Sequence, residues 1–311
     1  MTRPLLLVGQ PLLAPLLPLL RADHDVIALW EAHTPGDLAK VDALVWAGEF
    51  PLGRNLIDAM PRLRLIACFT VGYDGVDVAL ARERGIAVAH AGNANADDVA
   101  DHAIGLILAH RRWIVAGDRQ LRAGQWTIES KTRTRSMGGA QLGIVGMGAI
   151  GVAVAERARA MKMRIGWWGP RAKPNLSCPR ADSLEALARG SDILVIAARA
   201  DAHNRGMIDA RILDALGPDG LLVNVARGQL VDEVALVAAL RDGRLGGAAL
   251  DVFDPEPTDP SRWADIANVV LTPHMGGATH EAVGRMAQVL MANLAAHFAG
   301  EELPSPVPAD G

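Results

Sequence analysis

The sequence predicts an α/β protein built from two doubly wound parallel sheets. Two observations lead to this fold class. Short apolar runs bounded by turn residues alternate with helical patterns, and a glycine-rich turn joins one of these runs to an alanine-rich helix. Such runs are typical of parallel strands covered by helices on both faces. At 311 residues, the chain has room for two domains of ordinary size.

The apolar runs fall into two sets, one within residues 4–92 and the other within residues 142–273. The first set consists of PLLLVG, DALVWAG, LRLIACF and IAVAHAG. The second consists of LGIVG, RIGWW, DILVIAA, GLLVNVA, GAALDVF and NVVLTP. We expect each run to form a strand and each set to belong to one domain.

Two long helical patterns connect and close these sets. Asn95 or Asp97 can cap a helix that runs to about Gly124. The second pattern covers residues 279–300 and can return to the first domain. We therefore predict a discontinuous first domain, residues 1–96 plus 284–311, and a continuous second domain, residues 97–283.

The composition excludes several classes of protein. Hydrophobic residues make up 50% and charged residues 21%, which is typical of a globular chain rather than a disordered one. The net charge of −4 gives no general attraction to nucleic acid or acidic membranes. Cys68 and Cys178 cannot form a disulfide framework, and neither has a CxxC partner. We predict no metal site.

The leucine-rich start looks like a secretion signal only superficially. Pro11, Pro15 and Pro18 interrupt it, and no small-x-small cleavage site follows. It is also too broken to span a bilayer as one apolar helix of about 20 residues. We therefore expect a buried first strand and a soluble, cytoplasmic protein.

The segment LGIVGMGAIGVAVAERARAM places Gly146, Gly148 and Gly151 in a G-x-G-x-x-G spacing. The spacing is a weak signal alone, but here it follows an apolar strand and opens a helix, as a dinucleotide-binding turn requires. Gly146 permits the tight turn, Gly148 lets backbone N–H groups approach a pyrophosphate, and Gly151 lets helix and strand pack closely. The helix N-terminus adds partial positive charge. The alternative is a tight turn without a ligand.

The next strand, RIGWW, ends at Gly169 instead of the acidic residue that often binds the adenosine ribose. A carboxylate there would repel the 2′-phosphate of NADP. Glycine leaves space for it, and Arg171 and Lys173 can pair with the phosphate. The sequence therefore favours NADPH, with NADH possible. The alternative is that GPRAKP is only a solvated turn.

Three later strands end in polar residues. NVARG delivers Arg227, GAALDVFDPEP delivers Asp251 and then Glu256, and NVVLTPHMGG delivers His274. In an open parallel sheet, ligands bind outside the carboxyl ends of the strands, so these loops should face one crevice. Each residue alone has an ordinary structural explanation. Their occurrence at successive strand ends behind a dinucleotide turn favours a functional one.

These side chains suit the reduction of a 2-oxo acid. Hydride delivery to a carbonyl carbon leaves charge on the oxygen, and His274 can give the required proton. Glu256 can hydrogen-bond the other ring nitrogen and keep the ring protonated. Arg227 presents a planar fork to a carboxylate and can also polarise the carbonyl.

The combination of GIVGMGAIG, NVARGQLVDE, ALDVFDPEP and LTPHMGGATHE resembles the D-isomer-specific 2-hydroxyacid dehydrogenase family over nearly the whole chain. Through SDILVIAA and LRDGRLGGAALDVFDPEP it is most similar to the NADPH-dependent glyoxylate/hydroxypyruvate reductases and the hydroxyphenylpyruvate reductases. The resemblance implies a Rossmann cofactor domain and a flavodoxin-like substrate domain, with the active site in the cleft. It also implies reduction of glyoxylate and hydroxypyruvate to D-2-hydroxy acids.

The resemblance implies roles for single residues. Arg227 binds the substrate carboxylate, His274 is the acid–base group and Glu256 is its partner. The backbone N–H groups of Val71 and Gly72 match the family's carboxylate-binding loop. The implied cofactor contacts are Val99, Gly146, Met147, Gly148, Ala149, Ile150, Gly151, Gly169, Arg171, Lys173, Ala198, Val225, Ala226, Asp251, Gly276 and Gly277, with Asp251 near the nicotinamide amide.

Some positions depart from the family pattern or have no clear counterpart. Ala149 stands where an arginine is frequent, and Pro170 stands where NADP-using relatives place theirs. Arg199 and Asp201 are unusual in their loop, and the resemblance assigns them no role. Trp46 is the last residue of the run DALVW and either binds the substrate or only packs locally.

The resemblance further implies a homodimer formed through the helix and arm of residues 97–140. The basic run Lys131, Arg133 and Arg135 in this arm fits a solvated or interface face better than a nucleic-acid site. Among enzymes, the alternatives are an NAD-dependent D-2-hydroxyacid dehydrogenase and a 3-phosphoglycerate dehydrogenase. The alternative outside enzymes is a dinucleotide sensor similar to corepressors that share this fold.

Overall fold

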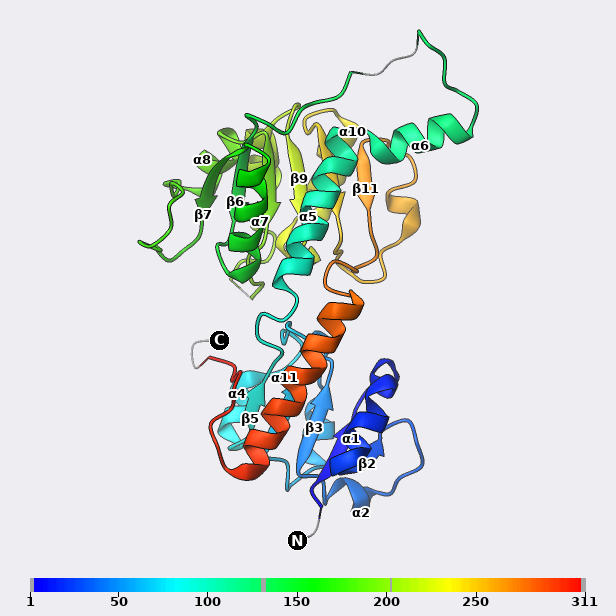
Figure 1. The fold of residues 1–311 in the computed structure, drawn as a ribbon, viewed down its shortest axis with the longest axis vertical. Coiled ribbons are helices and arrows are strands. Elements are labelled where there is room, and N and C mark those ends of the chain that lie inside the picture. Colours follow the sequence, from blue (N-terminus) through cyan, green and yellow to red (C-terminus); the bar gives the residue numbers. More distant parts are fainter. Residues whose placement is uncertain (1–2, 130–132, 202, 309–311) are drawn as a thin grey trace. The chain divides into compact units, whose positions relative to one another are not determined.

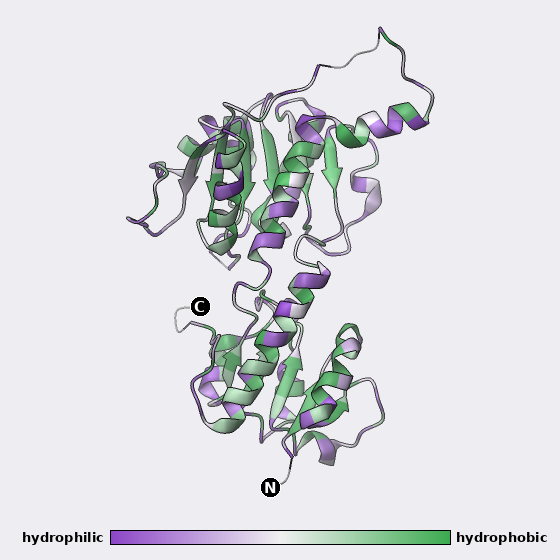
Figure 2. Cartoon of the chain, viewed as in Figure 1, coloured by the Kyte–Doolittle hydropathy of each residue, from purple (hydrophilic) through white to green (hydrophobic). Residues whose placement is uncertain are grey.

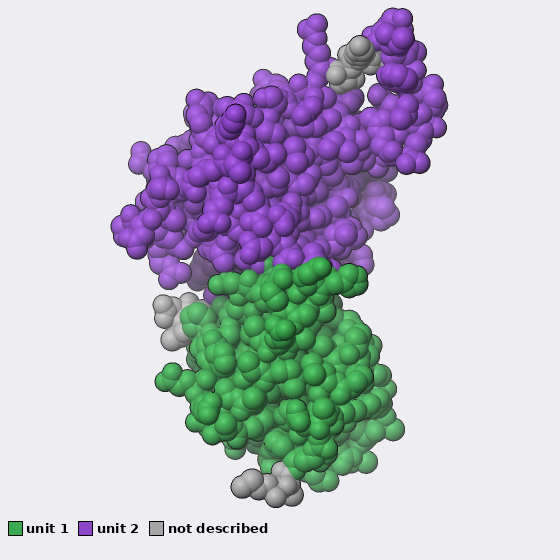
Figure 3. Space-filling model, in the orientation of Figure 1, with its two compact units in different colours: residues 1–95, 280–311 green, residues 96–279 purple. Residues whose placement is uncertain are grey.

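A computed structural model of the chain describes residues 3–129, 133–201 and 203–308. The chain divides into two compact units, residues 1–95 with 280–311 and residues 96–279 (Figure 3). The expected boundaries fell after residues 96 and 283, and the observed ones fall after residues 95 and 279. Each unit contains one parallel sheet flanked by helices, which confirms the predicted fold class (Figure 1).

The sheet of the first unit has the strand order β2-β1-β3-β4-β5, and all its strands run parallel. They are β1 (Leu5–Val8), β2 (Asp25–Ala28), β3 (Ala43–Trp46), β4 (Leu65–Cys68) and β5 (Ala87–Ala89). The strand β2 was not among the strands that the apolar runs predicted. This strand lies at the sheet edge and is only partly buried, so it lacks the continuous apolar run of a central strand.

The leucine-rich start forms β1 and then a short 3-10 helix, η1 (Pro11–Leu16), that continues into α1 (Leu17–Asp23). Proline is tolerated in the first turn of a helix, where its missing N–H has no partner to lose. Leu13 and Leu20 pack into the core of this unit. The remaining helices are α2 (Pro35–Leu38), α3 (Arg54–Asp58), α4 (Val78–Glu83) and α11 (His280–Ala299), whose Met286, Leu290 and Leu294 join the same core.

The sheet of the second unit has the order β11-β10-β9-β8-β6-β7, again all parallel. The strands are β6 (Gln141–Val145), β7 (Arg164–Trp168), β8 (Ile193–Ile196), β9 (Leu221–Asn224), β10 (Gly247–Leu250) and β11 (Val269–Leu271). The helices are α5 (Ala96–Arg111), α6 (Ile114–Arg122), α7 (Ala149–Ala160), α8 (Leu184–Arg189), α9 (Ala210–Leu216) and α10 (Glu233–Arg241), with 3-10 turns η2 (Gly228–Leu230) and η3 (Pro260–Arg262). Figure 2 shows the strands as predominantly hydrophobic and the helices as mixed, as expected for sheets covered on both faces.

The single helix expected from residue 97 to about 124 is in fact two helices. Trp113 separates α5 from α6 with a left-handed backbone (φ 54°, ψ 35°), and its N–H donates to the His110 carbonyl at 3.1 Å. The break lies where the core contacts of α5 end, because α6 has no buried residue. Figure 1 shows α6 and the segment after it leading away from the sheet. Residues 130–132 of the expected arm, Lys131 included, lie outside the described residues.

In the described part of the chain, no helix combines the length and the apolar character needed to cross a membrane.

Candidate active site

The glycine turn follows β6 and opens α7. Gly146 has φ +91°, and a Cβ on it would lie 2.6 Å from the Cα of Ala198. A Cβ on Gly151 would lie 2.1 Å from the Gly146 carbonyl oxygen. Backbone conformation and close packing therefore account for both glycines. The turn lies beside Ala198 at the point where β6 separates β7 from β8, which is the switch point of this sheet.

Gly148 needs a different explanation. Its φ is −74°, which any residue adopts, and a Cβ there would meet no atom within 4 Å. Neither strain nor packing in the described chain requires a glycine at this position. A side chain here would instead fill the space in front of the first turn of α7, which contains no acidic residue. This open space beside helix N–H groups fits the pyrophosphate of a dinucleotide.

The segment after β7 carries positive charge beside this turn. Lys173 Nζ donates to the Met147 carbonyl at 2.6 Å, so this side chain reaches back to the glycine turn. Gly169 is not required by crowding, since a Cβ there would be 3.4 Å from the Trp167 ring, an ordinary contact. Arg171 is exposed on the same segment.

Arg180 is a residue of this region that the sequence analysis missed. Its Nε and Nη2 donate to the Gly169 carbonyl at 3.1 and 2.7 Å, and its guanidinium lies 5.9 Å from the centre of the Trp167 ring. An isolated bridge between Trp167 and Arg180 brings it there. No sequence pattern pointed to it, because this pairing joins a strand to an irregular segment.

Arg227 follows β9 and is half-buried. Its Nη1 donates to the Ala226 carbonyl at 2.8 Å, and its own carbonyl accepts from the Asn224 side chain at 2.9 Å. A Cβ on Gly228 would lie 1.9 Å from the carbonyl carbon of Phe253. This close approach packs the loop that carries Arg227 directly against the loop that carries Glu256.

Glu256 and His274 form the pair that the sequence predicted. His274 Nδ1 lies 2.7 Å from Glu256 Oε2, and Glu256 Oε1 accepts from the Phe253 N–H at 3.0 Å. Burial raises the pKa of the Glu256 carboxyl, but the hydrogen bonds from His274 and Phe253 and the charges of His274 and Arg227 together hold it below its ordinary value. A carboxylate at Nδ1 fixes the proton on that nitrogen and orients the imidazole ring.

Asp251 anchors the loop on which His274 stands. The Asp251 carbonyl accepts from the His274 N–H at 2.7 Å, and its carboxylate accepts from the Met275 and Gly276 N–H groups at 3.0 and 2.9 Å. His274 itself has a left-handed backbone with φ +50°. Non-glycine residues adopt this conformation infrequently, and histidine does so more readily than most. Several hydrogen bonds to one buried residue, Asp251, therefore hold the loop that carries His274 in place.

Two further side chains, Thr272 and His102, contact the Asp251 carboxylate, and no sequence pattern indicated either of them. Thr272 Oγ1 donates to Asp251 Oδ1 at 2.6 Å, and His102 Nε2 of α5 lies 2.9 Å from Thr272 Oγ1 and 3.2 Å from Asp251 Oδ1. Asp251 is only 2% exposed. Burial raises its pKa, but the bonds from His102, Thr272, Met275 and Gly276 outweigh burial and lower the pKa to about 2.

The other predicted cofactor contacts also follow strand ends or face the sheet. Ala149 and Ile150 begin α7, Val99 is a buried residue of α5, Val225 and Ala226 follow β9, and Gly276 and Gly277 follow β11.

Asp201 supports its own loop: its carboxylate accepts from the His203 N–H at 2.7 Å, and its own N–H donates to Asn204 at 2.9 Å. Asn204 in turn donates to the Arg199 carbonyl at 2.8 Å. These contacts explain Asp201 as a loop-forming residue.

The predicted substrate residues Val71, Gly72 and Trp46 belong to the first unit. The Val71 carbonyl lies 3.0 Å from His90 Nδ1, and the Gly72 carbonyl accepts from Thr70 Oγ1 at 2.8 Å. Within the described chain, the N–H groups of Val71 and Gly72 donate no hydrogen bond. This arrangement fits an anion such as a carboxylate.

Trp46 makes local packing contacts within the first unit. It is 7% exposed, its ring lies against Gly9, and its N–H donates to the Phe50 carbonyl at 2.9 Å. These contacts account for Trp46 as a packing residue of the first unit, and its contact with a substrate stays a prediction.

Comparison with known proteins identifies the family. Residues 104–276 match the D-isomer specific 2-hydroxyacid dehydrogenase NAD binding domain. The chain is 44% identical over 253 residues to a hydroxyphenylpyruvate reductase of Plectranthus scutellarioides, covering 81% of each chain. It is 42% identical over 253 residues to glyoxylate/hydroxypyruvate reductase A of Arabidopsis thaliana, again covering 81% of each.

Among solved structures, the chain is similar to an NADPH-dependent glyoxylate/hydroxypyruvate reductase of Sinorhizobium meliloti in complex with NADP and malonate. The TM-score is 0.91 at 34% identity, covering 98% of this chain and 97% of the other. The range that matches the family model includes the glycine turn and the loops of Arg227, Glu256 and His274. The chain therefore belongs to the D-isomer-specific 2-hydroxyacid dehydrogenase family and is an oxidoreductase with a nicotinamide dinucleotide cofactor.

Proposed function

We propose that this protein reduces small 2-oxo acids, with glyoxylate and hydroxypyruvate ahead of larger aryl pyruvates, to D-2-hydroxy acids with NADPH. The observation that carries the proposal is the 2.7 Å contact between His274 Nδ1 and Glu256 Oε2 on loops beside Arg227. A histidine oriented by a carboxylate is the arrangement that general acid catalysis requires. Relatives named as glyoxylate/hydroxypyruvate reductases support the choice of substrate.

NADPH, when bound, supplies the hydride, and the glycine turn and the first turn of α7 would hold its phosphates. Side chains of this protein bind the substrate, polarise its carbonyl group and supply the proton. Arg227 binds the substrate carboxylate through its planar fork and polarises the carbonyl. His274 holds a proton at Nε2 and gives it to the developing alkoxide, and Glu256 stabilises the protonated ring.

The direct test is a steady-state comparison of NADPH and NADH oxidation with glyoxylate, hydroxypyruvate and phenylpyruvate. We expect turnover with NADPH that is fastest with one of the two small acids. A preference for NADH would favour an NAD-dependent D-2-hydroxyacid or 3-phosphoglycerate dehydrogenase. Tight cofactor binding without turnover on any acceptor would favour a dinucleotide sensor.

The preference for NADPH rests on Lys173 and Arg171 near the glycine turn. Replacing either with alanine should lower the ratio of kcat/KM for NADPH to that for NADH by about tenfold, because each removes one charge-assisted contact to the 2′-phosphate. NADH kinetics should change little, because NADH lacks that phosphate.

Arg164→Ala is the matched control, since Arg164 is exposed at the opposite end of β7. If the ratio is unchanged in both Lys173→Ala and Arg171→Ala, the segment after β7 is only a solvated turn.

We also propose a homodimer formed through residues 97–140. Large apolar side chains are exposed just before α6, on α6 and on the segment after it: Trp113 (45%), Ile114 (56%), Leu121 (61%), Trp126 (63%) and Ile128 (72%). Figure 1 shows this part of the chain leading away from its own sheet, and α6 has no buried residue. Several large exposed apolar side chains within one short stretch of the chain are typical of an interface, here with a second copy.

The dimer proposal predicts a change in oligomeric state. The double variant Leu121→Asp with Trp126→Ser should sediment as a monomer at concentrations where the wild type is a dimer, because a charge would be buried in the interface. Leu12→Asp is the control, since Leu12 is 52% exposed but lies outside the arm. A wild type that is monomeric at all concentrations would contradict the proposal.

A further inference from the structure

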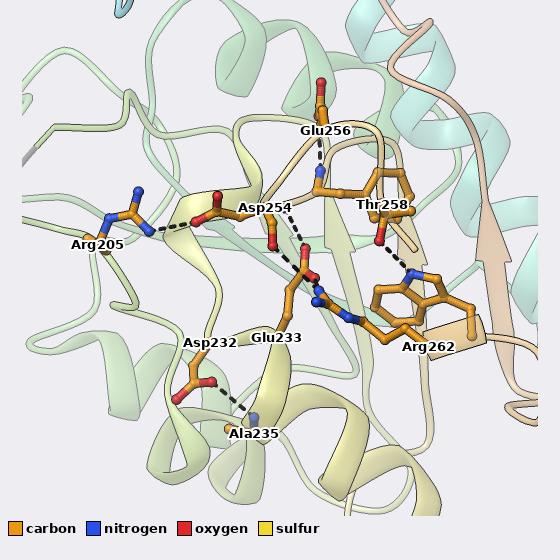
Figure 4. Close-up of polar contacts among 10 residues, drawn as sticks. Arg205, Asp232, Glu233, Ala235, Asp254, Glu256, Thr258 and Arg262 are labelled. Carbon is orange, nitrogen blue, oxygen red and sulfur yellow. Dashed lines mark hydrogen bonds and ion pairs between the residues drawn. The ribbon is translucent and has the colours of Figure 1, made fainter. Parts of the chain in front are cut away.

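The loop that presents Glu256 is held by a charged network that the proposed mechanism does not use (Figure 4). Asp254 lies at its centre, two residues before Glu256. Its N–H donates to Glu233 Oε1 at 2.7 Å, and its carbonyl accepts from Arg262 Nη1 at 3.4 Å. Its carboxylate accepts from Arg205 Nη1 at 2.5 Å. Both backbone groups and the side chain of Asp254 are therefore engaged.

Glu233 is the buried member of this network. Its side chain is 7% exposed, and its second oxygen pairs with Arg262. Glu233 begins α10, but the helix N-terminus is capped by Asp232, whose carboxylate accepts from the Ala235 N–H at 3.0 Å. Glu233 is therefore not needed as a cap, and Figure 4 shows its side chain pointing toward Asp254 and Arg262.

A contribution to folding stability alone does not explain why the charged side chain of Glu233 is buried here. Desolvation of a buried ion pair largely offsets its attraction, and apolar replacements of similar volume are frequently neutral or stabilising. Burial indeed raises the pKa of Glu233, against the opposing effects of the Asp254 N–H and of Arg262. The Glu233–Arg262 pair instead fixes the position of Asp254, because both partners form directional hydrogen bonds with its backbone.

Arg205 adds a connection to the loop of Arg227. While its Nη1 binds Asp254, its Nη2 donates to Gln229 Oε1 at 3.0 Å. Gln229 lies two residues after Arg227, just as Asp254 lies two residues before Glu256. Arg205 thus ties together the loops that carry the substrate-binding arginine and the histidine partner, although it is itself 61% exposed.

We propose that Glu233 is a positioning residue for proton transfer, which acts by fixing Asp254 and so setting the position of Glu256 against His274. Arg205 assists from the other side of Asp254. Neither residue touches the reacting atoms. This inference rests on the proposed role of His274 and Glu256, and it adds a second layer of residues on which that pair depends.

The test is a double-mutant cycle on kcat, with the acceptor that the wild type turns over best. Glu233→Gln keeps an oxygen for the Asp254 N–H but loses the charge that pairs with Arg262. We expect it to lower kcat about tenfold with less than about a twofold change in the Kd for NADPH, the signature of an interaction needed in the transition state. In a Glu256→Gln background, the same change should lower kcat less than about twofold, because the residue through which it acts is gone.

The outcomes distinguish a failure of the proposed function from a failure of the positioning role of Glu233. If wild-type protein does not turn over with any acceptor, the proposed function fails. If it does, and Glu233→Gln lowers kcat equally in both backgrounds or not at all, the positioning role is wrong. Should Glu233→Gln fail to fold, Arg205→Gln repeats the cycle at an exposed site, with a smaller loss of kcat and the same non-additivity expected. Arg189→Gln, which removes an exposed arginine paired with Glu185 within α8, is the control without effect.

Discussion

Replacing His274 with alanine is expected to lower kcat for glyoxylate reduction by about 10²- to 10⁴-fold, the usual contribution of a positioned general acid. The reason lies in the geometry of the pair, because Glu256 contacts Nδ1 at 2.7 Å and orients the ring whose Nε2 is the proposed proton donor. The Kd for NADPH should change less than about twofold, since the glycine turn is untouched. Steady-state kinetics and a fluorescence titration of NADPH measure the two quantities.

His33→Ala provides the comparison for this variant. His33 is an exposed histidine of the first unit whose Nδ1 lies 2.8 Å from the Glu31 carbonyl, so its loss should leave kcat near the wild-type value. If His274→Ala retained kcat within about threefold of the wild type, another group would have to give the proton. The proposed roles of both His274 and Glu256 would then be wrong.

The features that the sequence predicted are those set by local geometry or by strand order. A G-x-G-x-x-G turn between a strand and a helix has one backbone solution, and Gly146 and Gly151 occupy the crowded positions that this solution requires. Arg227, Glu256 and His274 each follow a strand of one parallel sheet. Parallel strands place their carboxyl ends at one edge, so the topology alone brings these loops to the same side.

The features that escaped prediction depend on contacts between distant segments. His102 and Thr272 are separated by 170 positions, and no local pattern indicates that they meet on Asp251. Arg180 reaches Gly169 only through an isolated bridge. The break at Trp113 follows from where the core contacts of α5 end, whereas the helical pattern continues past it. The hydrophobic periodicity of a segment indicates which of its faces is apolar, but it does not indicate how far the core surface that packs against that face extends.

The largest effect on stability is expected from Asp251→Asn. The carboxylate accepts from Thr272, Met275 and Gly276 and lies beside His102, at a site that is only 2% exposed. An amide of the same shape presents an NH₂ group to donors, so one buried donor loses its acceptor. We expect the free energy of unfolding to fall by about 2–4 kcal/mol, from the lost bonds and the lost charge stabilisation together. Urea unfolding at pH 7 measures this difference.

The lowered pKa of the Asp251 carboxyl predicts how the difference in free energy of unfolding between wild type and Asp251→Asn depends on pH. Its pKa is lowered from 3.8 to about 2 in the folded protein, so the ionised form contributes about 2 kcal/mol above pH 4. Because the folded pKa is the lower one, this contribution declines as the pH falls from 3.8 and is lost on passing below about 2. The stability gap between wild type and Asp251→Asn should therefore be constant at neutral pH and smaller at pH 3. Asp265→Asn, at an exposed aspartate paired with Arg241, should show almost no gap at pH 7.

Kinetics of the Asp251→Asn variant distinguish two roles for this residue. If Asp251 acts mainly as the anchor of the His274 loop, kcat should fall at least about tenfold while the Kd for NADPH changes little, because the His274 ring loses its fixed position. If Asp251 acts mainly by contacting the nicotinamide amide, the Kd should rise with a smaller change in kcat. The bonds that its carboxylate and carbonyl accept from residues 272–276 favour the first result. Oδ1 accepts from Thr272 and Met275 and Oδ2 accepts from Gly276, which reduces the acceptor capacity of Asp251 for a ligand.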